Sequence, residues 1–212
     1  MKKWLLFLIV FLANTTQAQN VIQYNVPFVS QAPNGNWRDK IFADACEETS
    51  LIMAYAWVMG EPLEVRNAMH KIHAIAAWEK NRFGFHQDTS VFDTYVIATE
   101  YLHLPAQYQS NITVDDVLTA LQEKNLVVAP INASKLYRGG PPRHMILVSG
   151  FDYSVNEFIY SDPMKKNGAN LRISRDVLQS ILRDYPSGVH KTVRTQTTAM
   201  IKIPWPWIDN PS

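Results

Sequence analysis

The spacing of hydrophobic positions changes about halfway along the chain. In the segment 62–82, apolar residues recur every three or four positions, which is the period of an α-helix with one buried face. Later in the chain, short apolar runs alternate with turn-like segments, a pattern that is typical of β-strands. Helices first and strands later, within one mixed unit, predict an α+β domain in which the helical half packs on an antiparallel sheet. The apolar positions that mark the buried face of 62–82 are Val65, Met69, Ile72 and Ile75.

Residues with known capping preferences set the limits of the predicted helices. Gly60 closes a first helix, since glycine readily adopts the left-handed backbone found just after helix ends. Thr89 or Ser90 caps a third helix. Thr113 begins a fourth, with Asp116 placed three residues later as in a capping box. The predicted helices cover about residues 45–59, 62–82 and 90–103, and the fourth follows Thr113.

The second half contains four apolar runs that predict strands, with one short helix among them. Ser174 caps this helix, which runs to about Leu182. The Pro-Trp-Pro-Trp segment 204–207 cannot continue a sheet, because proline lacks the backbone donor. We therefore divide the mature chain into a domain, 19–203, and a tail, 204–212, whose tryptophans are expected to pack on the domain, to cover its cleft or to bind a partner. The predicted strands are 126–131, 144–151, 157–161 and 198–203.

The first 18 residues have the pattern of a secretory signal peptide. Lys2 and Lys3 give a positive start, an apolar run follows over residues 4–13, and the small residues Thr16 and Ala18 provide a cleavage site. The apolar run is about half the length that a membrane-spanning helix needs. The sequence therefore predicts an exported protein, periplasmic or secreted, that is cleaved after Ala18 and has no stable membrane span afterwards.

Composition and charge narrow the choice of partners. With 47% hydrophobic and 18% charged residues, the 212-residue chain can build a hydrophobic core without disulfides. Its formal charge of +1 becomes −1 once Lys2 and Lys3 leave with the signal peptide. Binding to nucleic acid needs a basic surface, so a nucleic-acid partner is not expected. The sequence leaves the oligomeric state open.

Cys46 is the single cysteine of the chain. An exported protein normally pairs its cysteines in disulfides, so a lone cysteine is either buried and inert or has a chemical role. Asp44 and Glu47 are spaced as a capping box, which predicts that a helix begins just before Cys46. The thiol would then lie at the positive end of the helix dipole, which favours the thiolate and hence a nucleophile.

A nucleophilic thiol needs a base, and the base needs a group that orients it. Among the six histidines, His144 opens a predicted strand directly after the loop 139–143, where it can reach a cleft. Asp162 ends the next strand, and a hairpin centred on residue 153 would place the two side chains opposite each other on one face. Asp162 would then hold the imidazole and stabilise its charged form. Taken separately, His144 also fits a core or surface histidine, and Asp162 fits a turn residue.

The oxyanion formed during acyl transfer needs hydrogen-bond donors. The backbone N–H of Cys46 provides one, and the side-chain amide of Gln31, fifteen residues upstream, can provide a second. The alternative is that Gln31 is a solvated loop residue.

A metal site was also considered on the second predicted helix. His70 and His73 lie one turn apart, with Glu79 and His86 further on. These residues do not form a tight ligand set, so we interpret them as a solvated helix face and expect no metal.

Four segments together resemble the C39-like peptidases of the papain-like superfamily. They contain Gln31, Cys46, His144 and Asp162, in the order and rough spacing of that family's glutamine, cysteine, histidine and aspartate blocks. The resemblance covers about residues 24–165 and implies a papain-like fold. It also implies a Cys-His-Asp triad that attacks an amide carbonyl of a peptide or protein substrate, forms an acyl-enzyme and releases it with water, without a metal or an organic cofactor. The segments are Val26–Gln31, Ala45–Leu51, His144–Asp152 and Ser161–Pro163.

Glu47 departs from the family's pattern, because many relatives carry glycine directly after the cysteine. A carboxylate beside the nucleophile would raise the thiol pKa, unless it turned back to the helix start in a capping box. Three functions therefore remain open. The first is an exported thiol hydrolase of peptide or related amide bonds, the second is a C39-like binding module with weak or no activity, and the third is a papain-like amidase or transferase that acts on cell-wall peptides.

Overall fold

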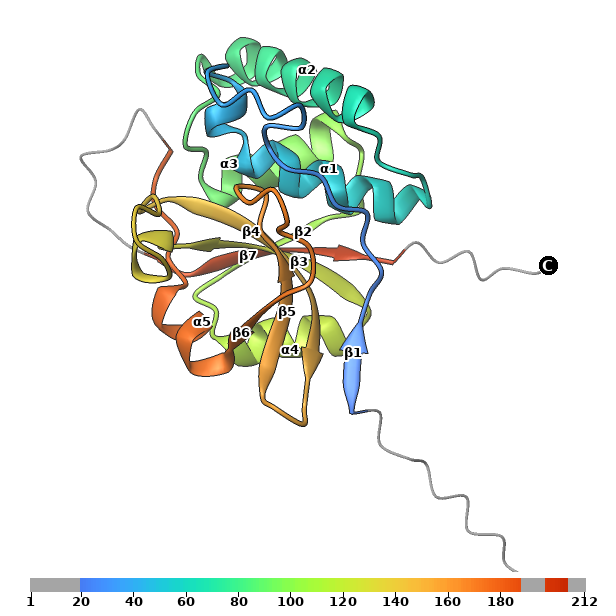
Figure 1. Cartoon of the computed structure of the whole chain (residues 1–212), viewed down its shortest axis with the longest axis vertical. Helices are drawn as coiled ribbons and strands as arrows, with labels where there is room; N and C mark the ends of the chain where they lie inside the picture. The colour runs from blue at the N-terminus through green and yellow to red at the C-terminus, as the bar shows by residue number, and fades with distance from the viewer. Residues whose placement is uncertain (1–19, 188–196, 206–212) are drawn as a thin grey trace, which may run out of the picture.

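A seven-stranded antiparallel sheet forms the centre of the structure, a computed structural model that describes residues 20–187 and 197–205 (Figure 1). The strands are β1 (Val21–Gln23), β2 (Gln107–Ser110), β3 (Asn125–Ile131), β4 (His144–Asp152), β5 (Glu157–Ser161), β6 (Leu171–Ser174) and β7 (Ala199–Pro204). Six of them lie in the order β2-β7-β3-β4-β5-β6, and β1 pairs with the end of β4. The predicted α+β class with an antiparallel sheet is confirmed.

Helices cover both faces of this sheet. They are α1 (Cys46–Met59), α2 (Val65–Phe83), α3 (Val91–Val96), which runs into a π-helical segment, η2 (Ile97–Tyr101), α4 (Val114–Gln122) and α5 (Arg175–Ile181). The first three lie on one face, while α4 and α5 lie on the other (Figure 1). The helices of the first half thus pack on the sheet as predicted, and the opposite face has a cover of its own.

The central strand β4 is buried on both faces because each face carries helices. Successive side chains of a strand point to opposite sides. Met145 and Leu147 therefore join the same core as α1, whereas Ile146 and Val148 join the core of α4 and α5. This burial explains why the strand is a continuous apolar run in the sequence, and it holds His144, its first residue, in a rigid frame.

Most predicted elements are present within a few residues of their predicted ends. The helix after Thr113 begins with the predicted capping box, in which Thr113 N donates to Asp116 Oδ2 over 2.8 Å. The strands β1, β2 and β6 were not predicted. Each contains only three or four residues, which is too short for a two-residue alternation to be recognised.

The buried face of α2 is shorter than its sequence pattern predicted. Ile72 and Ile75 are fully buried and Met69 is partly buried against the same core, but Val65 is 50% exposed. Val65 is the first residue of the helix. The helix therefore begins beyond the core that its later turns cover, and it leaves an apolar side chain on the surface.

The last strand reaches Pro204, one residue further than predicted, and pairs it with Asn125. Trp205 then donates its backbone N–H to the carbonyl of Lys124 over 3.1 Å, and its ring packs edge-on against Trp57 with centroids 4.6 Å apart. Trp57 lies eleven residues after Cys46 on α1, a distance of about 16 Å along the helix. Trp205 packs on the domain at the end of α1 that is remote from the cysteine.

Two predictions concern residues outside the described ranges, namely the signal peptide over 1–18 and the position of Trp207. Across 20–187 and 197–205, no helix combines the length and the hydrophobicity needed to cross a membrane.

Candidate active site

Cys46 is the first residue of α1 and follows a short 3-10 turn over Phe42–Asp44. The predicted capping box is absent. Ala45 occupies the N-cap position without a side-chain capping bond, Asp44 belongs to the 3-10 turn, and Glu47 points to the thiol instead. The start of the helix was predicted correctly, whereas its stabilising contacts were not. The thiol still lies in the first turn, where backbone N–H groups have no acceptor within the helix.

The carboxyl group of Glu47 lies against the thiol. Cys46 Sγ donates to Glu47 Oε2 over 3.0 Å, and both side chains are buried. Burial raises the pKa of Cys46 well above its usual value, and the charge of Glu47 and the hydrogen bond to it raise the pKa further, against an opposing hydrogen bond with the Met145 backbone. Burial also raises the pKa of Glu47 to about 8. Burial and the Glu47 carboxyl group thus oppose the thiolate that the helix N-terminus was expected to favour.

His144 and Asp162 form a buried pair. Nε2 of His144 lies 2.7 Å from Oδ1 of Asp162, and both side chains are almost completely inaccessible. Burial alone would raise the pKa of Asp162, but the hydrogen bond and the charge of His144 outweigh it and hold this pKa below its usual value. Lys165 adds an ion pair over 3.8 Å at Oδ2. Because Nε2 is held by Asp162, Nδ1 is the ring nitrogen left for a second partner.

The strands that carry this pair are in a different register from the predicted one. A turn centred on residue 153 would pair His144 directly with Asp162, whereas the sheet pairs Leu147 with Ser161 and contains an irregularity between Val148 and Gly150. Asp162 follows the last residue of β5 and lies outside the strand pairing. Its backbone N–H donates to the carbonyl of Gly168 over 2.9 Å. The contact with the imidazole depends on this loop and not on cross-strand pairing.

Gln31 lies in the loop before α1 and is buried. Its Nε2 donates to the carbonyl oxygens of Phe42 and Ala43 over 3.0 and 3.1 Å, while Oε1 has no hydrogen-bond partner within the described residues. Gln31 is therefore not the solvated loop residue of the alternative interpretation. To donate to an oxyanion, Nε2 would have to exchange one of its two carbonyl acceptors.

The predicted site residues meet at one cleft of about 330 Å³. Cys46 and Gln31 line it from one side, His144 lines it from the start of β4, and Asp162 lies behind the imidazole. The other lining residues include Asp44, Asp88, Pro141, Pro142, Arg143 and Met164. The tertiary structure thus brings Gln31, Cys46, His144 and Asp162 together from four separate segments.

A pair of buried carboxyl groups near Cys46 was missed by the sequence analysis. Glu48 on α1 and Glu79 on α2 are fully buried. Burial, together with the neighbouring carboxyl groups, raises the pKa of Glu48 well above its usual value, and burial raises that of Glu79 to about 9. Among the described residues, none of the four carboxyl oxygens has a hydrogen-bond partner. Burying an unpaired carboxylate is costly, which favours the protonated form of both groups. No spacing in the sequence marks this pair, since it depends on how two helices cross.

The interpretation of these residues as a solvated helix face is wrong for Glu79 on α2 and also for His86, which lies beyond the end of α2 and is 8% exposed. His73 instead forms an ion pair with Asp39 over 3.3 Å and packs edge-on against Phe42. Among the described residues, no group of three or more histidine, cysteine or acidic side chains is arranged to hold a metal ion.

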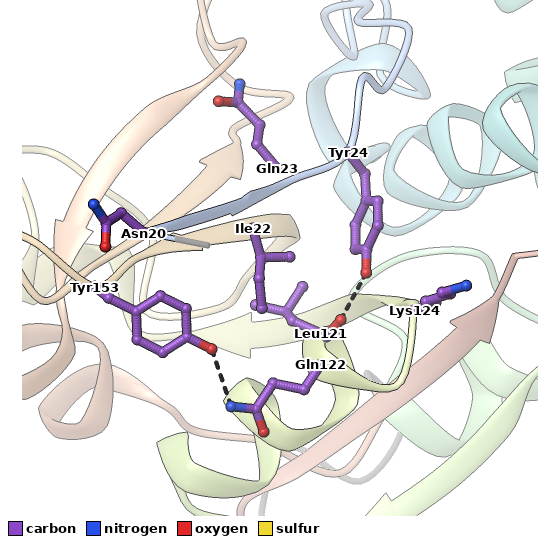
Figure 2. A pocket seen from close by; sticks show the side chains of 8 residues that line it. All are labelled: Asn20, Ile22, Gln23, Tyr24, Leu121, Gln122, Lys124 and Tyr153. Atoms are coloured by element: carbon purple, nitrogen blue, oxygen red, sulfur yellow. Dashed lines mark hydrogen bonds between the residues drawn. The ribbon is translucent and has the colours of Figure 1, made fainter. Parts of the chain in front are cut away.

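A separate pocket of about 600 Å³ lies near the opposite end of β4 from His144 (Figure 2). The rings of Tyr24 and Tyr153 lie on either side of Ile22 and Leu121 in this view. Tyr24 donates to the carbonyl of Leu121 over 2.7 Å, and Gln122 donates to Tyr153 over 3.0 Å. None of the residues that line this pocket also lines the cleft at Cys46.

Comparisons with known proteins agree with this architecture. A crystal structure from Bacillus anthracis, described as that of a C39-like peptidase, matches with a TM-score of 0.56 and 15% identity, over 87% of this chain and 98% of the other. An identity this low shows the fold alone, which fits the papain-like fold. No curated protein matches. The model of the Peptidase_C39 like family matches residues 23–187, which include all four predicted site residues, and the chain therefore belongs to this family.

Proposed function

We propose that this protein is an exported cysteine peptidase that hydrolyses peptide or related amide bonds. Cys46 is the nucleophile, His144 is its base, and Asp162 orients the base. The observation that carries this proposal is the shared cleft, which Cys46 and His144 both line while Asp162 holds His144 Nε2 at 2.7 Å. This leaves Nδ1 for the thiol, which is the arrangement that a thiol, a base and an orienting group require.

The reaction follows from these positions. Cys46 Sγ attacks the carbonyl carbon of the substrate while its proton passes to Nδ1 of His144. The imidazolium, stabilised by the charge of Asp162, then gives this proton to the leaving amine, and a thioester remains on Cys46. Water, deprotonated by His144, releases the acid product and restores the thiol.

The tetrahedral intermediate needs donors for its oxyanion. The backbone N–H of Cys46 is available as the first N–H of α1. Gln31 is the second donor in this proposal, and it reaches the oxyanion by giving up its bond to the carbonyl of Phe42 or Ala43. Removing one such donor typically lowers kcat by about 10²–10³-fold.

The test is hydrolysis of a peptide mixture, followed by mass spectrometry, by the native protein, by His144→Ala and by Cys46→Ala. A hydrolase should cleave peptides only while Cys46 is present. The pH dependence of Cys46 alkylation by iodoacetamide, without peptide, completes the test: His144→Ala should move alkylation to higher pH, because the imidazole no longer takes the thiol proton. Full activity in Cys46→Ala, or no hydrolysis together with alkylation unchanged by His144→Ala, would reject the proposal.

A second function is favoured by the contact between Cys46 and Glu47, because this contact raises the thiol pKa. In that case the protein binds peptides in the cleft without cleaving them. Peptide binding to the native protein without product formation, even when Glu47 is replaced by the glycine found in many relatives, would support this binding module over the hydrolase.

We also propose that the chain is exported to the periplasm or the medium after cleavage behind Ala18. The basis is the signal-peptide pattern of residues 1–18. N-terminal sequencing of the protein recovered from each cell fraction tests this, and a chain that retains Met1 in the cytoplasm would contradict it.

A further inference from the structure

A second, larger pocket adjoins the cleft at Cys46. It has a volume of about 700 Å³, which is within the usual range for ligand pockets. We call it the Trp37 pocket, and its lining includes Phe28, Pro33, Trp37, Val65, Met164 and Lys166.

The Trp37 pocket and the cleft share a wall. Met164 lines both. Gln31 lines the cleft, and its two neighbours, Ser30 and Ala32, line the Trp37 pocket. A chain lying in the cleft can therefore place a side chain in the Trp37 pocket without leaving the surface.

The shared wall is held in place by contacts between its two segments. Ser30 Oγ and the backbone N–H of Gln31 both donate to the carbonyl of Pro163, over 3.1 and 2.8 Å. The ring of Phe28 approaches Gly168 so closely that a Cβ there would lie 3.0 Å from it. These contacts lie within the protein itself, so they fix the wall of the pocket, and a fixed wall lowers the entropy lost on binding.

The lining of the pocket is more apolar than polar, and it remains accessible. Trp37 is 44% exposed and Val65 is 50% exposed, so two large apolar side chains face solvent at one place. Exposed apolar surface gathered in a pocket is typical of a binding site, and tryptophan is the residue type most often found at the centre of such sites. A large apolar side chain of a ligand would be complementary to this surface.

A cation lies at the edge of the pocket. Lys166 is exposed and lines the pocket, and it makes no ion pair with any described residue. The preceding residue, Lys165, is engaged with Asp162 over 3.8 Å and lies over the ring of Tyr137. Lys166 is thus the ammonium group left to meet an anionic group on a ligand.

We propose that the Trp37 pocket selects the substrate. It binds an aromatic or large aliphatic side chain of a peptide whose backbone lies in the cleft at Cys46, and Lys166 binds a carboxylate close to that side chain. The carboxylate belongs either to an acidic side chain or to the free C-terminus of the peptide. This inference rests on the proposed function, because it takes the cleft to be the place where the peptide is cleaved.

The experiment is a positional scan with fluorescent peptides of alanine and serine. Each peptide carries one phenylalanine, and the peptides form three series. In the first series the carboxylate is that of an aspartate and the C-terminus is amidated. In the second it is the free C-terminus, and in the third the peptide has no carboxylate. Affinity is measured by fluorescence anisotropy on the mature Cys46→Ala protein, which cannot turn over. Hydrolysis of the same peptides is measured on the native protein.

We expect peptides with phenylalanine at one position to bind about 10- to 100-fold more tightly than all-alanine peptides, which is the effect of burying one large apolar side chain. Trp37→Ala or Val65→Ser in the Cys46→Ala background should remove most of this preference. Lys166→Glu should reverse the preference for the carboxylate, and added salt should weaken it. Both apolar positions are exposed, so neither substitution should unfold the protein, which thermal melting checks.

Tyr153→Ala, in the separate pocket of Figure 2, is the matched control and should leave every preference unchanged. Equal affinity for all peptides, or a preference that survives both Trp37→Ala and Val65→Ser, overturns the pocket inference, and hydrolysis of the peptides would then still support the hydrolase. Selective binding without any hydrolysis keeps the pocket inference and rejects the hydrolase. Comparison of the aspartate peptides with the free C-terminus peptides identifies which kind of carboxylate Lys166 binds.

Discussion

The thiol of Cys46 donates a hydrogen bond of 3.0 Å to Oε2 of Glu47, the residue that follows it on α1. Both groups are buried, and burial raises the pKa of each. The carboxyl group of Glu47 raises the pKa of the thiol further, whereas the hydrogen bond from the thiol lowers the pKa of Glu47. The helix N-terminus favours the thiolate, but burial and the neighbouring carboxyl group outweigh it. Burial and the carboxyl group therefore favour the neutral thiol of Cys46 in the free protein, and the proposed reaction needs His144 to take the proton once the substrate is bound.

Replacing Glu47 by glutamine should lower the thiol pKa, because the amide keeps the size of the side chain and removes its charge. Because the pKa of Glu47 is about 8, the charge is removed only above that pH. Alkylation of Cys46 at pH 9 should become several-fold faster, and its pH midpoint should move down. Rates of iodoacetamide reaction between pH 5 and 10 measure this, with Glu61→Gln, on the exposed turn after α1, as the control. An unchanged midpoint in Glu47→Gln would mean that burial alone sets the thiol pKa.

Removing the base should lower hydrolysis by about 10²–10⁴-fold, which is the usual contribution of general acid–base catalysis. His144→Ala should do so directly. Asp162→Asn should lower kcat by loss of orientation and charge, with less effect on KM. The exposed His70 of α2 supplies the control variant, His70→Ala. Steady-state kinetics on one selected peptide give both constants, and a His144→Ala protein with native kcat would contradict the assigned role.

The ionisation of Asp162 should also make the free energy of unfolding depend on pH in the acidic range. Its pKa in the folded protein is held below the usual 3.8, so its contribution is present above about pH 4 and is lost as pH falls through the folded pKa. The free energy of unfolding of the native protein should fall below pH 4. In Asp162→Asn the fall should be smaller, because the contribution of the Asp162 carboxylate is absent at every pH. Urea unfolding at pH 3, 4, 5 and 7 measures the difference, and parallel curves for the two proteins would exclude a role for Asp162 in acid unfolding.

The buried pair of Glu48 and Glu79 should make the free energy of unfolding fall as the pH rises, which is the opposite of the effect of Asp162. The pKa of Glu79 is raised from 4.5 to about 9, and that of Glu48 is also raised. Their neutral forms stabilise the fold below about pH 4.5, and this stability is lost as pH rises towards 9. Glu79→Gln should therefore stabilise the protein at pH 8–9 by about 1–3 kcal/mol, the range for relieving an unpaired buried polar group.

Chemical unfolding between pH 5 and 9 provides the measurement for Glu79→Gln. Glu123→Gln, at an exposed position after α4, is its control. Equal slopes of stability against pH in the native protein and in Glu79→Gln would show that the buried pair is not what opposes folding at high pH.

Gly168 packs against the backbone of Asp162. A Cβ at this position would overlap the carbonyl oxygen of Asp162, whose N–H is bound by the carbonyl of Gly168. Gly168→Ala should destabilise the protein by about 1–3 kcal/mol through overpacking and should also lower activity, because the loop that positions Asp162 must move. Gly84→Asn, at the left-handed C-cap of α2 with open space around it, is the comparison. Thermal melting and kcat measured together test both effects, and a Gly168→Ala protein with native kcat would show that the loop tolerates the shift.

The sequence by itself determined the elements that carry strong periodicity, and it grouped the residues that we propose carry the chemistry. The continuous apolar run of β4 and the glycine that ends α1 are local features, so their positions could be predicted from local rules. The joint spacing of Gln31, Cys46, His144 and Asp162 sufficed to group them, because a family conserves the order of its site segments along the chain. Short strands such as β1 and β2 escaped prediction, since three or four residues show no reliable period.

Only the tertiary structure decided what surrounds these residues. Glu47 was expected to turn back to the helix start, yet its carboxyl group meets the buried sulfur of Cys46, and Ala45 occupies the N-cap of α1. The contact of His144 with Asp162 depends on the loop that Gly168 closes, and the sequence register alone would have placed it in the strand pairing. Burial decides the charge of the thiol and of the acids beside it, and burial is a property of the assembled fold because residues remote in sequence exclude the water.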